Sequence, residues 1–282
     1  MTHGPVAIIG LGLIGGSLAR ALHERGVPVR GWSSSGEDRE LAARAGIPVA
    51  DDARAAASDA AVIVFAVPID HLAGAADSVL HGVDAGIIAL HVGGLQRQRA
   101  LCLEDRQYAR LIGTHPLAGS HQSGFAASRG ELFVGATVSV EARAGALARA
   151  SAEWVWRSAG AARIEYRTAE EHDRLMAWVS QLPQVTATAL AAALATEGID
   201  PRAMGPGGRD TTRLAASPFE QWRPLLAAAS GDVTAALRAL EEQLARLRAA
   251  VETNDAEALA ELWSAGRAWR RTAEHASEDD AS

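Results

Sequence analysis

The 282-residue sequence has a single cysteine, Cys102, and no lysine. One cysteine permits neither a disulfide within the chain nor a thiolate metal cluster, so no metal site is expected. The absence of lysine excludes catalysis through a lysine Schiff base. No stretch reaches the roughly 18 apolar residues of a membrane-spanning helix, and the apolar run Val6–Leu13 is too short and too glycine-rich for a signal sequence. These absences predict a cytoplasmic protein without a membrane partner.

Charge and hydrophobic content narrow the choice of partner. The formal net charge is -7, which argues against nucleic acid or an anionic membrane as the main partner. It does not forbid a local basic pocket for an anionic metabolite. Hydrophobic residues make up 48% of the chain, enough for a substantial buried core. We therefore expect a globular protein that binds a small molecule.

The first half of the chain alternates short apolar runs with alanine-rich amphipathic stretches. The run Ala61–Ala66 is apolar throughout, which is typical of a parallel strand covered on both faces. Strands that alternate with helices predict an α/β fold with a doubly wound, mostly parallel sheet of the Rossmann type. The expected strands are Pro5–Ile9, Val27–Trp32, Ala61–Ala66, Gly86–Leu90, Arg110–Gly113 and Thr137–Glu141, and the first two expected helices are Ile14–Arg25 and Glu37–Ala45.

The second half reads as helical from Thr168 to about Glu274, with almost no β-branched runs. Three prolines, Pro201, Pro218 and Pro224, are expected between helices. We expect an α/β domain over residues 1–166, an all-helical domain over 167–274, and a disordered acidic tail over 275–282.

Two long helices are expected in the second domain, Val179–Glu197 and Val233–Glu252, and the second of these is amphipathic. The first is too apolar to face water, and a small helical domain has little room to bury it. The sequence therefore predicts a homodimer formed through the helical domain.

A glycine-rich turn follows the first expected strand, where residues 6–17 read VAIIGLGLIGGS. In this pattern Gly10 allows the tight turn, Gly12 lets the backbone approach a pyrophosphate, and Gly15 lets the helix pack closely on the strand. The free N–H groups at the start of the helix suit phosphate oxygens. We therefore expect a nicotinamide dinucleotide here. The residues expected to contact its central part are Gly10, Gly12, Leu13, Ile14, Gly15, Val67 and Pro68.

The end of the second strand lacks the acidic residue that usually grips the ribose 2′-hydroxyl of NAD. Ser33, Ser34 and Ser35 stand there instead, and Arg39 follows in the next helix. Hydroxyl groups do not repel a 2′-phosphate, and an arginine pairs with one. The cofactor is therefore expected to be NADP or NAD, with NADP slightly favoured. The alternative is a solvated serine loop beside NAD bound by other contacts.

Two further segments are rich in polar groups that suit catalysis or anion binding. Residues 113–124 read GTHPLAGSHQSG directly after an expected strand, where parallel sheets place their chemistry, so His115 is the preferred catalytic candidate. Residues 205–214 read GPGGRDTTRL and put Arg209 and Arg213 one helical turn apart. Such a pair binds carboxylates, or, alternatively, Arg209 and Asp210 make only local ion pairs.

Together these segments resemble the prephenate and arogenate dehydrogenases of tyrosine biosynthesis, over nearly the whole chain. The motifs that carry the resemblance are the glycine turn, GTHPLAG at 113–119, EHD at 171–173, SQLPQ at 180–184, RDTTR at 209–213, and Trp222. The resemblance implies NAD(P)-dependent oxidative decarboxylation of a cyclohexadienyl carboxylate. It implies that His115 binds the substrate's 4-hydroxyl and takes up its proton. It also implies that Arg213 binds a substrate carboxylate and that Trp222 lies beside the substrate, although Trp222 fits a helix-packing role nearly as well.

Three segments depart from the family pattern. Gly94 stands where many members have a serine that helps to hold the histidine and the 4-hydroxyl, Gln181 and Gln184 replace two histidines after Ser180, and Gly208 replaces an aromatic. Neutral Gln184 loses any positive charge near the substrate side chain, which fits arogenate. The substrates that remain open are prephenate, arogenate and 4-amino-4-deoxyprephenate. Two other classes also remain open: a β-hydroxyacid or imine reductase, and a non-catalytic nucleotide-binding sensor.

Overall fold

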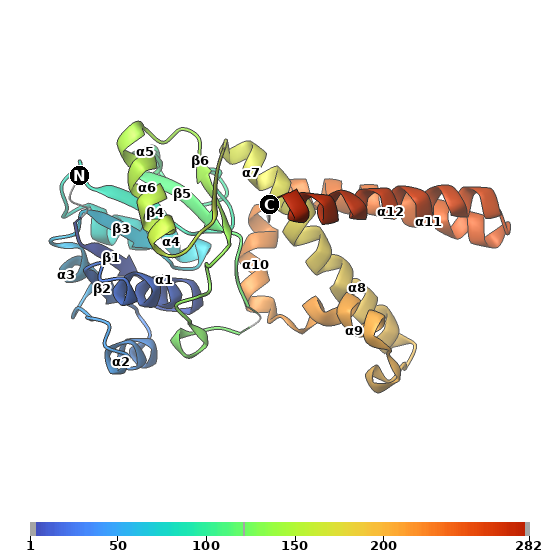
Figure 1. Cartoon of the computed structure of the whole chain (residues 1–282), viewed down its shortest axis with the longest axis horizontal. Coiled ribbons are helices and arrows are strands. Elements are labelled where there is room, and N and C mark those ends of the chain that lie inside the picture. The colour runs from blue at the N-terminus through green and yellow to red at the C-terminus, as the bar shows by residue number, and fades with distance from the viewer. Residues whose placement is uncertain (1–3, 121, 280–282) are drawn as a thin grey trace. The chain divides into compact units, whose positions relative to one another are not determined.

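The computed structural model describes residues 4–120 and 122–279, with side chains as far as Thr272 (Figure 1). Among these residues, strands β1 to β7 form one sheet in the order β2-β1-β3-β4-β5-β6-β7. Neighbouring strands are parallel except β5 and β6, which are antiparallel. The strands are β1 (Val6–Ile9), β2 (Val29–Trp32), β3 (Val62–Phe65), β4 (Ile88–His91), β5 (Leu111–Pro116), β6 (Thr137–Glu141) and β7 (Arg163–Arg167). The predicted doubly wound α/β fold is confirmed.

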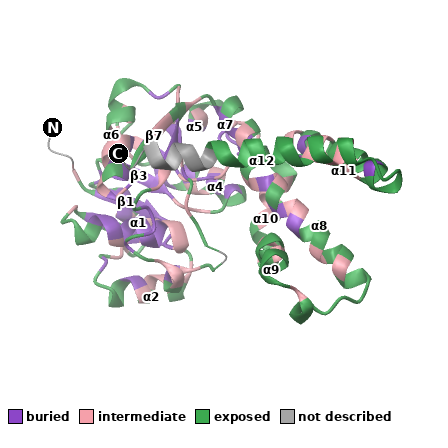
Figure 2. Ribbon diagram, turned by 45° about the vertical axis from the view of Figure 1, so that its right-hand side comes forward, coloured by how far each residue is buried: buried purple, intermediate pink, exposed green. Residues whose placement is uncertain are grey.

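Helices cover both faces of this sheet. One buried cluster joins strand side chains such as Ile8 and Val64 to Leu18 of α1 and Trp156 of α6. On the other face, α3 and α4 contact β1 and β3. Figure 2 shows the buried residues concentrated in the sheet and these helices. The helices of this part are α1 (Leu13–Glu24), α2 (Gly36–Arg44), α3 (Ala53–Ala57), α4 (Ile69–Leu80), α5 (Asp105–Arg110) and α6 (Ala146–Ser158).

The strand that the sequence does not reveal is β7. It is an edge strand that pairs with β6 alone, and its residues RIEYR are all partly or fully exposed. Because it is not covered on both faces, it lacks the continuous apolar run that marks β1 and β3. The six expected strands all form, with small shifts at their ends.

The chain then becomes helical. A capping box between Thr168 and Glu171 starts α7, and a π-helical turn at Ala177–Gln181 joins α7 directly to α8. The helices are α7 (Ala169–Met176), α8 (Leu182–Thr196), α9 (Pro206–Thr212), α10 (Phe219–Ala228), α11 (Ser230–Glu252) and α12 (Ala256–Asp279).

Two helical predictions are wrong in detail. Pro224 lies inside α10 rather than between helices. It costs that helix only the hydrogen bond to the carbonyl of Glu220, and α10 accommodates it. The tail that was expected to be disordered from residue 275 is helical as far as Asp279, because neither proline nor glycine interrupts the end of α12. Residues 280–282 lie outside the described residues.

The chain forms two compact units, Met1–Asp232 and Val233–Ser282. The first holds the sheet together with α7 to α10, and the second consists of most of α11 and all of α12, which lie side by side (Figure 1). The expected domain boundary near residue 166 does not coincide with the boundary between these two compact units, and it stays a prediction. In the described part of the chain, no helix is long and apolar enough to cross a membrane.

Candidate active site

The glycine turn lies at the carboxyl end of β1, where the strand order reverses between β1 and β3. Gly10 has φ +101°, and a Cβ there would lie 2.3 Å from the carbonyl oxygen of Ala66. A Cβ on Gly15 would lie 1.9 Å from the carbonyl oxygen of Gly10, so helix and turn touch directly. By contrast, no atom lies within 4 Å of a Cβ built on Gly12. The turn therefore has the tight and open positions that a dinucleotide-binding turn needs.

The start of α1 is free to bind phosphate. Its N-cap, Gly12, offers no side-chain cap, and the first turn holds no acidic residue. The N–H groups around Leu13 and Ile14 thus face the open space above Gly12, where a pyrophosphate fits. Val67 lies across the turn, with Cγ1 3.1 Å from a Cβ built on Gly10, and Pro68 begins α4 beside it.

The serine loop after β2 is organised by its own hydrogen bonds. Ser35 caps α2 by accepting the N–H of Asp38 at 3.1 Å, and Ser33 is buried while Ser34 is exposed. The Arg39 guanidinium donates to the carbonyl of Ser33, which holds this cation at the end of β2. The carboxylate of Asp38 accepts the N–H of Phe125 at 2.7 Å, so this nearby acid is already engaged.

His115 lies in β5 and is connected to two residues of α7. Its Nδ1 lies 3.0 Å from Nε2 of His172, and Nδ1 of His172 lies 2.8 Å from Oδ1 of Asp173. His172 and Asp173 are both buried. The Asp173 carboxylate also accepts the backbone N–H groups of Gln96 at 2.7 Å and Arg97 at 3.0 Å. This His115–His172–Asp173 chain ties the first helix of the second half to the carboxyl edge of the sheet.

The chain of hydrogen bonds determines the tautomers. A carboxylate only accepts, so His172 carries its proton on Nδ1 and presents a bare Nε2. His115 must then donate from Nδ1, which leaves its own Nε2 unprotonated and able to accept a proton. Burial, followed by repulsion from the neighbouring His172 and His91, lowers the pKa of His115 to about 3. His115 is therefore neutral near pH 7, the state that a general base needs.

Gly94 and Leu225 lie beside the His115 ring. A Cβ built on Gly94 would lie 3.8 Å from both Cε1 and Nε2 of the His115 ring and 3.3 Å from Cδ2 of Leu225. Gly94 is thus the residue whose backbone lies next to the basic nitrogen, with Leu225 close by. Leu225 belongs to α10, and half-buried Trp222 lies one turn earlier on the same face.

The π-helical turn decides which residues of the α7–α8 helix point inward. An extra residue in one turn shifts the helical phase by one position. As a result Gln181 and Gln184 share the buried face with Met176, while Ser180 is half-buried and Pro183 is exposed. Ser180, expected at the substrate site, makes no hydrogen bond to the described residues. The two glutamines are therefore the polar groups that α8 presents to the protein interior.

The two arginines of the RDTTR segment differ. Arg209, in α9, is exposed and donates to the carbonyl of Met204 at 2.6 Å. Arg213 follows α9 at the start of a short 3-10 turn, is exposed, and makes no ion pair with any residue described. Gln184 donates from Nε2 to the carbonyl of Leu214 at 2.9 Å, which brings α8 next to Arg213. Arg213 is thus the available cation.

Sequence reasoning did not assign roles to His172 and Asp173. Their EHD motif was visible at the start of a helix, but nothing local shows that this helix returns to β5. Their partners lie 57 positions away at His115 and 77 positions away at Gln96. Only the fold reveals these contacts.

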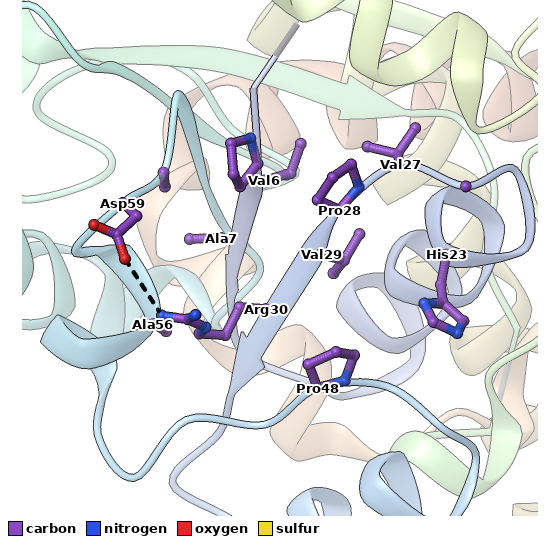
Figure 3. Close-up of a pocket in the computed structure, with 13 residues that line it drawn as sticks. Val6, Ala7, His23, Val27, Pro28, Val29, Arg30, Pro48, Ala56 and Asp59 are labelled. Carbon is purple, nitrogen blue, oxygen red and sulfur yellow. Dashed lines mark ion pairs between the residues drawn. The ribbon is translucent and has the colours of Figure 1, made fainter.

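A pocket of about 410 Å³ lies at the opposite end of the sheet, at the starts of β1 and β2 (Figure 3). Val6 and Val29 form part of its lining, and the Arg30–Asp59 ion pair, at 3.9 Å, lies at its side. Because parallel sheets place their chemistry at the carboxyl ends of the strands, this pocket is separate from the His115 site.

Comparison with known proteins identifies the family. The profile described as "Prephenate dehydrogenase, nucleotide-binding domain" matches residues 18–162, and "Prephenate dehydrogenase, dimerization domain" matches residues 168–265. The chain is 30% identical over 270 residues to a cyclohexadienyl dehydrogenase of Zymomonas mobilis, covering 91% of each protein. It is 26% identical over 279 residues to a prephenate dehydrogenase of Bacillus subtilis, covering 94% of this chain and 75% of that protein.

Solved structures show the same fold. Prephenate dehydrogenase from Aquifex aeolicus, in complex with hydroxyphenyl propionate and NAD+, superposes with a TM-score of 0.87 at 24% identity, covering 96% of this chain and 99% of that one. Arogenate dehydrogenase from Synechocystis gives 0.80 at 22% identity, covering 95% and 99%. These matches do not favour the reductase or the sensor. The chain is a dehydrogenase that belongs to the prephenate dehydrogenase family.

Proposed function

We propose that this enzyme carries out the NAD(P)-dependent oxidative decarboxylation of a cyclohexadienyl carboxylate, prephenate or arogenate, in tyrosine biosynthesis. The observation that carries the proposal is the basic Nε2 of His115, which lies beside Gly94 at the same sheet edge as the glycine turn. The 4-amino-4-deoxy substrate is not pursued, because the relatives are prephenate and cyclohexadienyl dehydrogenases.

A nicotinamide held at the glycine turn would supply the acceptor for the hydride of the ring carbon that bears the 4-hydroxyl. His115 Nε2 accepts the hydrogen bond of that hydroxyl and draws its proton as the hydride leaves. The electron pair of the bond between ring and carboxylate then enters the ring, CO₂ departs, and the proton returns to the phenolic oxygen. Asp173 and His172 hold the imidazole in the accepting tautomer and stabilise its charge while it carries the proton.

The remaining polar groups serve to position the substrate. We propose that the unpaired guanidinium of Arg213 binds the side-chain carboxylate. Trp222 borders the ring from α10, and Ser180 and Arg209 lie at the periphery of the site. Correct placement of the ring accounts for much of the rate, because the reacting atoms must be brought into line.

For the cofactor, we propose NADP with a slight preference over NAD. The support is the cation and the hydroxyls at the end of β2: Arg39 is held by the carbonyl of Ser33, Ser34 is exposed, and the carboxylate of Asp38 is engaged by the N–H of Phe125. The Arg39→Ser variant is then expected to raise KM for NADP about tenfold or more and to leave KM for NAD nearly unchanged. A wild-type KM for NAD well below that for NADP would overturn this preference.

We propose that the enzyme is a homodimer formed through its helical half. The support is the match to a dimerization domain and the exposed apolar side chains in and around α8, among them Trp178, Val179 and Leu190. Leu190→Asp is expected to convert the dimer to monomer in light scattering. A wild-type protein that is monomeric at micromolar concentration would contradict the assignment.

The proposed reaction is tested by offering the purified enzyme prephenate and arogenate with each cofactor while following reduced cofactor and released CO₂. His115→Asn is expected to lower kcat by roughly a hundredfold or more, the usual loss when a general base is removed. Arg213→Ala is expected to act mainly on KM. Failure of the wild-type enzyme to turn over either substrate would refute the proposal.

A further inference from the structure

Two glutamine side chains in the interior have carbonyl oxygens without a donor. Gln181 and Gln184 are 2% and 5% exposed, and the Oε1 atoms of both lack a hydrogen-bond partner in the described structure. Both point inward from one face of the α7–α8 helix, a single turn apart. A buried acceptor without a donor is costly, so such a pair indicates a donor that the protein itself does not supply.

The orientation of the Gln184 amide is fixed by chemistry. Its partner at 2.9 Å is the carbonyl of Leu214, which can only accept, so the NH₂ group must face Leu214 and Oε1 must face away. The hydroxyl of Thr188 donates to the backbone carbonyl of Gln184 at 2.9 Å, so Thr188 does not supply a donor to the side-chain Oε1. Gln184 therefore presents an acceptor, not a donor.

The Gln184 amide is bonded to the carbonyl of Leu214, the residue that directly follows Arg213, the proposed carboxylate anchor. A cation and a neutral acceptor side by side match the two groups of an α-amino acid: the carboxylate binds Arg213, and the ammonium donates to the amide oxygens. A keto group in place of the ammonium has no proton to donate and would leave both oxygens unpaired.

We infer that Gln184, with Gln181, selects a cyclohexadienyl substrate whose side chain carries an ammonium, arogenate, over the keto acid prephenate. The inference rests on the proposed function and adds the choice of substrate to it. A site built to pair a polar group rejects the analogue that lacks it, because its buried atoms are then unsatisfied. The expected ratio of kcat/KM for arogenate over prephenate is at least about tenfold.

Variants at position 184 test the role of the amide. Gln184→Leu keeps the approximate size and removes the acceptor, so it is expected to reduce the substrate ratio to within about threefold of one, mainly through KM for arogenate. Gln184→His adds a donor and is expected to improve the use of prephenate. Gln107→Leu is the matched control: Gln107 is also buried and donates from Nε2 to a backbone carbonyl, that of Ala73 at 3.0 Å, but it lies in α5. It is expected to lower stability and to keep the wild-type ratio.

A binding measurement separates this inference from the proposed reaction. With saturating oxidised cofactor, calorimetry compares L-tyrosine with 3-(4-hydroxyphenyl)propionate, which has the same ring and carboxylate but no ammonium. L-tyrosine is expected to bind at least about tenfold more tightly to the wild type, and the difference is expected to vanish in Gln184→Leu. Turnover of prephenate as fast as arogenate, or equal binding of the two ligands, would overturn the inference while leaving the reaction intact. An ammonium-dependent difference in binding without turnover would uphold it and refute the reaction.

Discussion

Replacing Asp173 by asparagine tests the proton relay without removing any group that touches the substrate. The carboxylate accepts hydrogen bonds from His172, from the N–H of Gln96 and from the N–H of Arg97. Asparagine offers one oxygen and one NH₂ group. Oδ1 of Asp173 contacts both Nδ1 of His172 and the N–H of Gln96, while Oδ2 accepts the N–H of Arg97, so either orientation of the amide sets its NH₂ group against a backbone N–H. An NH₂ group in place of Oδ1 also faces Nδ1 of His172.

In that orientation the tautomers along the chain are reversed. His172 would accept at Nδ1 and carry its proton on Nε2, which then points at Nδ1 of His115. His115 would keep its own proton on Nε2, the nitrogen that should accept from the substrate. In either orientation the negative charge that stabilises the protonated imidazole is lost, so the Asp173→Asn variant is expected to lose roughly a hundredfold or more in kcat, the scale of a lost general base. Loss of one hydrogen bond to a buried charge should also cost about 1.5–3 kcal/mol of stability.

The assay measures kcat, KM for the cofactor, and the melting temperature. Asp232→Asn is the matched control, because Asp232 also pairs with Arg97 but has no contact with the histidines. It is expected to keep kcat within about threefold while losing part of the same ion-pair network. If Asp173→Asn keeps kcat within about threefold of wild type, or if both variants lose activity equally, the tautomer argument is wrong.

Further predictions concern pH and the glycine turn. Burial, followed by the charge of Arg143, lowers the pKa of His91 to about 3, so below pH 6.5 the unfolded chain binds a proton that the folded state refuses. Neutral His91 therefore stabilises the folded state above pH 6.5, and this contribution is lost as the pH falls. In urea unfolding, the His91→Gln variant should lose about 2 kcal/mol less stability between pH 7.5 and 5 than the wild type. An unchanged pH slope would contradict this. Gly15→Ala, whose Cβ meets the carbonyl oxygen of Gly10 at 1.9 Å, should destabilise the fold by more than about 2 kcal/mol. Gly12→Ala meets nothing within 4 Å and should instead keep its melting temperature and weaken binding of the reduced cofactor; equal effects of the two would refute the account of the turn.

The sequence was sufficient to predict the sheet, because β1 and β3 are continuous apolar runs and the glycine turn has a known geometry. The family motif also points to His115 as the catalytic candidate, but β5 extends to Pro116, so His115 lies within the strand and not after it as expected. The sequence does not predict edge strand β7, because this strand is half-exposed and polar. The role of His172 and Asp173 could not be predicted for another reason. It depends on long-range contacts with β5 and with the loop at Gln96, which no local sequence pattern encodes.

The sequence likewise does not show that the side chains of Gln181 and Gln184 are buried. A regular helix from Ala169 onward would have turned Ser180 and Pro183 inward, and only the π-helical turn shifts the phase by one residue. Pro183 contributes to this turn because it has no N–H to donate to the carbonyl of Val179. The π-helical turn thus determines which polar groups, the amides of Gln181 and Gln184, the α7–α8 helix turns toward the protein interior.

The most direct test of the central claim is single-turnover release of CO₂ alongside the appearance of reduced cofactor, for the wild type and His115→Asn. With arogenate, the wild type is expected to form one CO₂ per reduced cofactor, and His115→Asn is expected to bind the cofactor normally while both products appear roughly a hundredfold more slowly. Wild-type rates in the variant, or reduced cofactor without CO₂, would contradict oxidative decarboxylation through His115.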